Sequence, residues 1–161
     1  ILSHINDSMR DFDHQDRQIL KQLQRDASRS VEDLADTIGL SRNATWRRVR
    51  RLEELGVIRR RVALIDPERV GLGLVVFIAV KTDRHDAAWA QDLARVVHDF
   101  PEIMGAYRIA GDTDYLLRAR VADVKAYDDL YQRLIARFEL KDVTASFVME
   151  EIKETTELPV G

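Results

Sequence analysis

The most concentrated chemistry in this chain is a run of guanidinium groups between residues 42 and 61. The run holds eight arginines and two glutamates, a local charge of +6 in a protein whose net charge is −3. A net-acidic protein that gathers its positive charge in one segment presents a directed field, and the phosphates of duplex DNA are the usual target of such a field. The segment therefore predicts double-stranded DNA as a partner.

Most of these arginines fall on the second of two short helices that are separated by a turn. Ser30 is a suitable N-cap for the first helix, Asp33 is an acid in its first turn, and Gly39 suits the left-handed residue that ends it. Ser41 is the next N-cap, and we expect the second helix to run to about Leu55. Two amphipathic helices around a Gly-Leu-Ser turn are typical of a helix-turn-helix.

The second helix divides into a core side and an outward side when its residues are placed at about 100° intervals. Thr45, Val49 and Leu52 fall on the core side. The outward side carries groups that can hydrogen-bond base edges or press on sugars and thymine methyls, and phosphate contacts are expected from Ser41, Arg42, Arg48 and the run 59–61. The predicted DNA-binding residues are Ser41, Arg42, Asn43, Trp46, Arg47, Arg48, Arg50 and Arg60.

A solvated helix face is the plainer alternative for these arginines. Arg50 precedes Glu53 by three residues and Glu54 by four, so pairing within the helix is available. The placement of the Gly-Leu-Ser turn between two amphipathic helices favours DNA binding. The β-prone stretch 57–65 carries three further arginines, and we expect it to form a short strand or wing on the DNA backbone.

Composition places the chain among globular proteins of one large or two small domains. It has 161 residues, 45% of them hydrophobic, and no cysteine. The lack of cysteine excludes a disulfide framework, a Cys-ligated zinc site and a Cys nucleophile, and it fits a cytoplasmic protein. No apolar run reaches ~18 residues, so no membrane partner is expected. The four histidines have no metal-ligand spacing, so we expect neither a metal nor a cofactor.

Charge and periodicity both change near residue 65. Residues 1–64 carry a net charge of +3 and residues 65–161 carry −6. We therefore expect a DNA-binding domain over residues 9–64, a linker over 65–72, and a second domain over 73–161.

The second domain alternates strands with helices. The hydrophobic pattern predicts a strand over 72–80, buried on both faces, and then a helix (86–100), two strands (103–110 and 115–121), a helix (123–138) and a strand (142–150). The order βαββαβ is that of a ferredoxin-like, split βαβ plan, so the whole chain is α+β. Two helices leave one face of a four-stranded sheet uncovered, and its apolar residues predict pairing with a second copy.

A second group of residues with possible chemistry lies in the turn between the two middle strands. Asp112 and Asp114 are two residues apart in a turn that Gly111 begins. Such a pair suits a simple β-turn, in which Gly and Asp are common, but also a ligand site, a metal site or an acid–base pair. From the residues alone, a ligand-binding turn and a small-molecule enzyme both stay open. No Gly-x-Ser-x-Gly motif or Gly-rich phosphate loop supports the enzyme.

From about Phe12 to Pro159 the chain resembles the Lrp/AsnC family, the feast/famine transcriptional regulators. The resemblance implies an N-terminal winged helix-turn-helix and a C-terminal ligand-sensing domain. It also implies dimers that pair through their sheets and commonly close into octamers, with small amino acid effectors between dimers. The segments that carry it are Leu40-Ser41, the run from Arg48 to Ile58, Leu72-Gly73, the run from Gly111 to Leu117, and the run from Lys153 to Pro159.

Two positions depart from the family pattern, and two segments resemble one branch of the family. The family usually has Pro where this chain has Ala44, and a small or aliphatic residue where it has Trp46; both lie in the second helix, so they bear on the target sequence. The segments 114–123 and 142–153 resemble the branch of cysteine-responsive detoxification regulators. That likeness implies a sulfur or small aliphatic amino acid as effector.

An amino acid is a zwitterion, so its pocket needs donors for a carboxylate and an acceptor for an ammonium. The turn offers both, through backbone N–H groups and two carboxylates, and glycine lets the backbone approach the ligand. Cysteine and a branched-chain amino acid are the first candidates. The predicted effector-binding residues are Tyr107, Gly111, Asp112, Thr113, Asp114, Tyr115 and Ser146.

Overall fold

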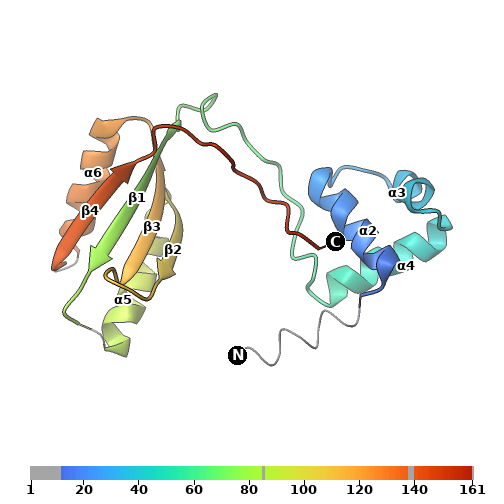
Figure 1. Ribbon diagram of the computed structural model, residues 1–161, viewed down its shortest axis with the longest axis horizontal. Coiled ribbons are helices and arrows are strands. Elements are labelled where there is room, and N and C mark those ends of the chain that lie inside the picture. The colour runs from blue at the N-terminus through green and yellow to red at the C-terminus, as the bar shows by residue number, and fades with distance from the viewer. Residues whose placement is uncertain (1–11, 85, 138–139, 161) are drawn as a thin grey trace. The chain divides into compact units, whose positions relative to one another are not determined.

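The computed structural model describes residues 12–84, 86–137 and 140–160 (Figure 1). The chain divides into two compact units. The first, which we call the helical unit, contains the described residues up to Leu64 together with those from Lys153 onward; the second, the sheet unit, contains residues 65–152. Each unit has a hydrophobic core of its own.

The helical unit is built on helices α2 (His14–Arg25), α3 (Val31–Ile38) and α4 (Arg42–Glu54). All three pack against one another, and each contributes apolar residues at helical spacing to a shared core. The buried members of this core are Ile19, Leu23, Leu34, Val49 and Leu52.

Local capping residues set the ends of these helices, as the sequence predicts for Ser30, Gly39 and Ser41. Ser30 and Asp33 form a reciprocal capping box at the start of α3, and Gly39 ends that helix with a left-handed backbone, φ +72°. Ser41 caps α4 and Asp13 caps α2, each by accepting a backbone N–H from the first turn. The turn between α3 and α4 is therefore specified by three consecutive residues of its own sequence.

The wing strand expected over residues 57–65 is absent from the part of the helical unit that the structure describes. Gly56 ends the α4 turn with φ +70°, and the chain then runs on without strand pairing as far as Asp66. No extended segment pairs with this backbone along its length, so its β-prone side chains are not enough to make a strand.

The last described residues lie with the helical unit, whereas the sequence assigned 153–161 to the second domain. The side chain of Gln24 pairs with the backbone of Leu158, and Arg17 donates to the carbonyl of Val160 at 3.3 Å. The predicted linker differs as well, because residues 65–72 group with the sheet unit. There Leu72 donates to the carbonyl of Pro67 at 2.8 Å and closes a turn.

The sheet unit has the predicted βαββαβ order, with antiparallel pairing throughout a sheet whose strand order is β2-β3-β1-β4. The expected helix end at Phe138 lies outside the described residues. The elements are β1 (Leu74–Lys81), α5 (Ala87–His98), β2 (Ile103–Arg108), β3 (Tyr115–Val121), α6 (Val124–Ile135) and β4 (Asp142–Phe147).

One face of this sheet packs against α5 and α6. Alternate residues of β1 and β3 point to the helices and form the centre of the core, because successive side chains of a strand point to opposite faces. The buried residues of this core are Val76, Ile78, Val80, Phe100, Leu117, Ala119, Val121, Leu130 and Leu134.

The other face, which we call the open sheet face, is lined by the alternate residues of the same strands. At its centre Phe77 of β1 lies between Arg118 of β3 and Ser146 of β4, and the side chain of Phe77 is 36% exposed. The prediction that β1 is buried on both faces is therefore wrong for a single chain at Phe77, because no element of the described chain covers that residue.

Candidate nucleic-acid interface and ligand site

Helix α4 presents two chemically different sides. Thr45, Val49 and Leu52 are at most 4% exposed and lock the helix into the core of the helical unit. The opposite side carries Asn43 and Trp46, both exposed; the indole of Trp46 is 53% exposed. An exposed indole on a helix has no stabilising role in the unit's own core, so this side is available to a partner.

The arginines on the exposed side differ in their contacts. Arg50 lies 3.4 Å from a carboxylate oxygen of Glu54 and 3.8 Å from one of Glu53, as the alternative of a solvated face predicts. Arg47 makes no ion pair within the described residues. Because exposed pairs at this spacing contribute only about 0.3–0.5 kcal/mol, a phosphate or a guanine can displace the partner of Arg50.

Arg48, which the sequence predicts to contact phosphate, is held by carboxylates of the same unit. Its guanidinium lies 2.8 Å from Asp13 and 2.8 Å from Asp16, and the hydrogen bond that it donates to the Asp16 carboxylate raises the pKa of Arg48. Arg51 approaches the second oxygen of Asp16 at 3.4 Å. The structure therefore uses Arg48 to fasten α4 to α2, and we do not retain it as a phosphate ligand.

Asp16 is a functional residue that the sequence reasoning missed. It is only 1% exposed. The available signal was its phase: Asp16 precedes Ile19 by three residues and Leu23 by seven, so it falls on the apolar stripe of α2. A buried carboxylate requires a partner, and the excess of arginines on α4 supplies two.

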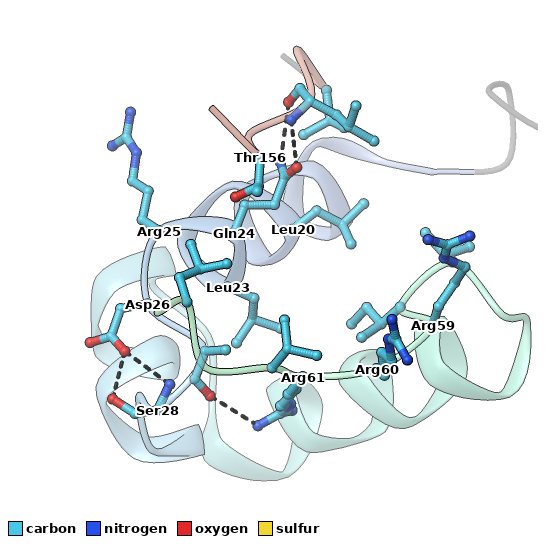
Figure 2. Close-up of a pocket in the computed structure, with 17 residues that line it drawn as sticks. Leu20, Leu23, Gln24, Arg25, Asp26, Ser28, Arg59, Arg60, Arg61 and Thr156 are labelled. Carbon is cyan, nitrogen blue, oxygen red and sulfur yellow. Dashed lines mark hydrogen bonds between the residues drawn. The ribbon is translucent and has the colours of Figure 1, made fainter. Parts of the chain in front are cut away.

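The arginines after α4 border a cavity of the helical unit (Figure 2). Arg61 donates to the carbonyl of Ala27 at 3.4 Å and pairs with Glu53 at 3.2 Å. Arg59 and Arg60 are exposed at the rim of the cavity. Arg60 is therefore accessible to a partner, whereas Arg61 is engaged within the unit.

The turn between β2 and β3 is held by the acid that we expected to bind an ammonium group. The Asp114 carboxylate accepts the backbone N–H of Thr82 at 2.9 Å, and the backbone N–H of Asp114 donates to Val80 at 3.1 Å. The carbonyl of Asp114 also accepts from Ile109 at 3.0 Å. These bonds fasten the turn to the end of β1, so Asp114 positions the turn.

The tip of the turn is open. Gly111 has φ +130°, a conformation that favours glycine, and nothing lies within 4 Å of the position that a Cβ would take there. The backbone N–H groups of Gly111, Asp112 and Thr113 make no hydrogen bond among the described residues, and Asp112 is exposed. Free N–H groups beside a free carboxylate are the donor and acceptor set that a zwitterion needs.

The three flanking residues are not brought together at the turn. Tyr115 is half-buried on the helix side of the sheet, where its ring lies 5.2 Å from that of Trp89. Tyr107 is on the open sheet face with its hydroxyl folded over Gly105. Ser146 is opposite Phe77, two strands from β3 and three residue pairs from the level of Tyr115. Ser146 is thus wrongly placed for the turn, because the strand order puts β4 at the far edge.

No group of His, Asp and Glu within the described residues is arranged to hold a metal ion. The helices in the described part of the chain are too short or too polar to cross a membrane.

Comparison with known proteins connects both sites to one family. Residues 12–59 match the family described as winged helix-turn-helix DNA-binding, and residues 75–158 match the Lrp/AsnC ligand binding domain. The DNA-binding transcriptional activator DecR of Escherichia coli (strain K12) is 45% identical over 150 residues, which are 92% of this chain and 99% of that protein.

Solved structures give the same result. An AsnC family transcriptional regulator from Agrobacterium tumefaciens superimposes with a TM-score of 0.91 at 49% identity, over 92% of this chain and 97% of that one. A transcriptional regulator from Neisseria meningitidis, solved as a complex with L-methionine, has a TM-score of 0.87 at 35% identity over the same shares of the two chains. These relatives are regulators, so the comparisons favour a regulator over the enzyme that Asp112 and Asp114 left open.

Proposed function

Because the chain belongs to the Lrp/AsnC family of DNA-binding transcriptional regulators, we propose that α4 reads operator DNA and that a small amino acid at the turn between β2 and β3 modulates this binding. The observation that supports α4 as the reader is the division of its two sides. One side is fixed by the core and by Asp16, while Asn43, Trp46 and Arg47 are exposed together. Such a helix enters a major groove without loss of its own packing.

Arginine substitutions on and beside α4 test this reading. Arg47→Ala is expected to cost ~1–3 kcal/mol at the specific operator and much less on unrelated duplex, if Arg47 reads a guanine. Arg60→Ala is expected to weaken all duplexes alike and to lower the salt slope by about one, because a phosphate contact carries no sequence information.

The matched control is Arg95→Ala, which removes an exposed arginine of α5 in the sheet unit. Fluorescence anisotropy over a series of salt concentrations measures all three variants, with a duplex that the wild-type protein has selected from random sequence. Equal affinity of the wild-type, Arg47→Ala and Arg95→Ala proteins for that duplex would remove α4 as the reader.

For the effector we propose a division of roles within the turn. The N–H groups of Gly111, Asp112 and Thr113 bind the carboxylate of the amino acid, and the carboxylate of Asp112 accepts from its ammonium group. Asp114 positions the turn through Thr82. The methionine complex of the Neisseria relative adds L-methionine to cysteine and the branched-chain amino acids as candidates.

Titration calorimetry with the twenty amino acids, one at a time, tests this site. Asp112→Asn is expected to lose the heat of binding because an amide does not neutralise an ammonium group. Asp142→Asn removes an exposed acid of β4 and serves as the control. If no amino acid gives heat at concentrations where DNA binds, the turn has only a structural role.

We further propose that the open sheet face pairs with a second copy, and that dimers close into octamers. An exposed Phe77 at the centre of a four-stranded sheet supports this, because such a surface is normally covered. A two-fold dimer presents two α4 helices, so its operator is expected to be a rough palindrome. The protein would act in the cytoplasm, where its DNA lies. Light scattering at micromolar concentration that reports a monomer would contradict the pairing.

A further inference from the structure

The last described segment of the chain is held on α2 by a paired contact between one side chain and the backbone. The amide oxygen of Gln24 accepts the backbone N–H of Leu158 at 2.6 Å, and the amide nitrogen donates to the carbonyl of the same residue at 3.1 Å. Figure 2 shows the Gln24 side chain reaching this segment. A side-chain amide that pairs with both polar groups of one residue binds an extended backbone as a neighbouring strand would.

Contacts on both sides of Leu158 extend this attachment. Arg17 donates to the carbonyl of Val160, and Arg25 lies 3.4 Å from a carboxylate oxygen of Glu157. Leu158 and Val160 also line the cavity of about 680 Å³ whose wall on α2 includes Leu20 and Leu23. Three residues of α2 thus hold three of the four residues 157–160.

This attachment has a topological consequence. The chain passes from one unit to the other twice, once after Leu64 and again after Ile152. Without the attachment only the first passage would constrain the helical unit, because the segment after the second passage would not be held to that unit. With it, the end of β4 leads to α2, the helix whose Asp16 also holds Arg48 and Arg51 of α4.

We propose that residues 157–160 form an intramolecular clasp on α2. The clasp is a second tether between the helical unit and the sheet unit of each chain. In the proposed dimer it fixes how far apart the two α4 helices stand on DNA. The proposal rests on the function proposed above for α4. A reading unit held at two points explores a smaller volume than one held by a single flexible connection, so a clasped pair discriminates more strongly between operator spacings.

The existence of the clasp is tested by hydrogen exchange in the full-length protein. Gln24→Ala removes both bonds to Leu158, and its matched control is Gln18→Ala, the same change on the same helix at a residue that does not line the cavity. The amide of Leu158 is expected to exchange about threefold to tenfold faster in Gln24→Ala than in wild type or in Gln18→Ala. Equal exchange in all three proteins would overturn the clasp, whether or not the protein binds DNA.

The tether is tested with two duplexes. One is selected by the wild-type protein from random sequence, and the other is the same duplex with five base pairs inserted between its half-sites, about half a helical turn. The ratio of the two affinities is expected to fall about threefold to tenfold in Gln24→Ala, with affinity for an isolated half-site unchanged. A protein that lacks residues 154–161 is expected to show the same loss.

Each outcome of this second experiment has one meaning. An unchanged ratio in both variants, alongside faster exchange at Leu158, would overturn the tether while leaving the clasp. A loss of half-site affinity in Gln24→Ala would also overturn it, because that result means damage to the helical unit rather than a change of spacing. Failure of the wild-type protein to select any duplex would contradict the function proposed for α4, and the exchange experiment would still decide the clasp.

Discussion

The two units of this protein leave opposite kinds of surface uncovered. The helical unit exposes arginines and an indole along α4, whereas the sheet unit exposes the aromatic ring of Phe77 between Arg118 and Ser146 on the open sheet face. A charged helix face suits a partner that carries phosphates, and an exposed aromatic residue at the centre of a sheet suits a protein surface that covers it. Each unit therefore has an uncovered surface whose chemistry favours a different kind of partner.

The two units also differ in how far their interiors depend on apolar packing. In the described residues, the helical unit buries five hydrophobic residues in its core and the sheet unit buries nine. The helical unit adds polar fastening instead: helix caps, the ion pairs of Asp16, and the contacts of Gln24 with Leu158. A small unit with few apolar contacts is expected to be the less stable of the two.

The largest expected difference between the two units is in their response to truncation of one buried leucine in each core. Leu52 and Leu117 are both 0% exposed, so Leu→Ala at either is expected to cost ~2–5 kcal/mol. Leu52→Ala should unfold the helical unit and abolish DNA binding while assembly of the sheet unit persists. Leu117→Ala should reduce assembly first. Hydrogen exchange resolved by segment measures both. A single transition shared by both units in each variant would contradict independent cores.

A charge on the open sheet face should break assembly and spare the helical unit. Phe77→Arg places a cation opposite Arg118, and the loss of an aromatic residue from the centre of an interface is expected to cost at least ~2 kcal/mol of association. Light scattering should report a monomer whose circular dichroism is unchanged. Val124→Arg, on the exposed side of α6, is the control and should assemble normally. Normal assembly of Phe77→Arg would place the interface elsewhere.

Neutralising Asp16 should weaken the polar fastening of α4. Asp16→Asn keeps the size of the buried side chain but removes the charge that faces Arg48 and Arg51. Because those arginine side chains are 29% and 50% exposed, solvent screens part of the interaction, and we expect a loss of ~1–3 kcal/mol in unfolding of the helical unit. Asp36→Asn, at an exposed site on α3, should change stability by less than ~0.5 kcal/mol. Equal melting temperatures for the two variants would assign Asp16 no role in fastening α4.

The parts of this structure that sequence predicts well are those set by neighbouring residues. Ser30, Gly39 and Ser41 each act on residues within one turn, so their types alone fix where α3 begins and ends and where α4 begins. Strand β3 was predicted with its observed bounds, since the turn before it and the alternation within it are also local. The family resemblance then supplied the arrangement of these elements.

The parts that sequence misses depend on residues that are distant in the chain. Asp16 meets Arg48 across 32 positions, and Gln24 meets Leu158 across 134. Ser146 was predicted to bind the effector at the turn, but alternation along a strand gives the face on which a residue lies and not the place of that strand in the sheet. The bond that the Asp114 carboxylate accepts was missed for the same reason, since its partner Thr82 follows a different strand.

The smallest effect that separates the two units is their response to acid. In the helical unit, the backbone N–H of Asp16 lowers the pKa of Asp13, and the Ser30 hydroxyl lowers the pKa of Asp33. In the sheet unit, the backbone N–H of Trp89 lowers the pKa of Asp86. A carboxyl with a lowered pKa in the folded state contributes stability that is fully present above its unfolded pKa of about 3.9 and is lost as the pH falls through the lower folded value.

Both units should therefore keep a constant melting temperature from pH 7 to about pH 5 and lose stability below about pH 4, the helical unit more steeply because it depends on more of these caps. Asp13→Asn tests the assignment, since asparagine caps a helix as well as aspartate does but has no charge to lose. Thermal melts at pH 7 and pH 3 should then show a smaller drop for the helical unit than in wild type, and an unaltered drop for the sheet unit. If the melting temperature of the helical unit falls as far in Asp13→Asn as in wild type, the acid sensitivity of that unit comes from other carboxyls. The contrast between a unit held by helix caps and one held by its core would then lose this support.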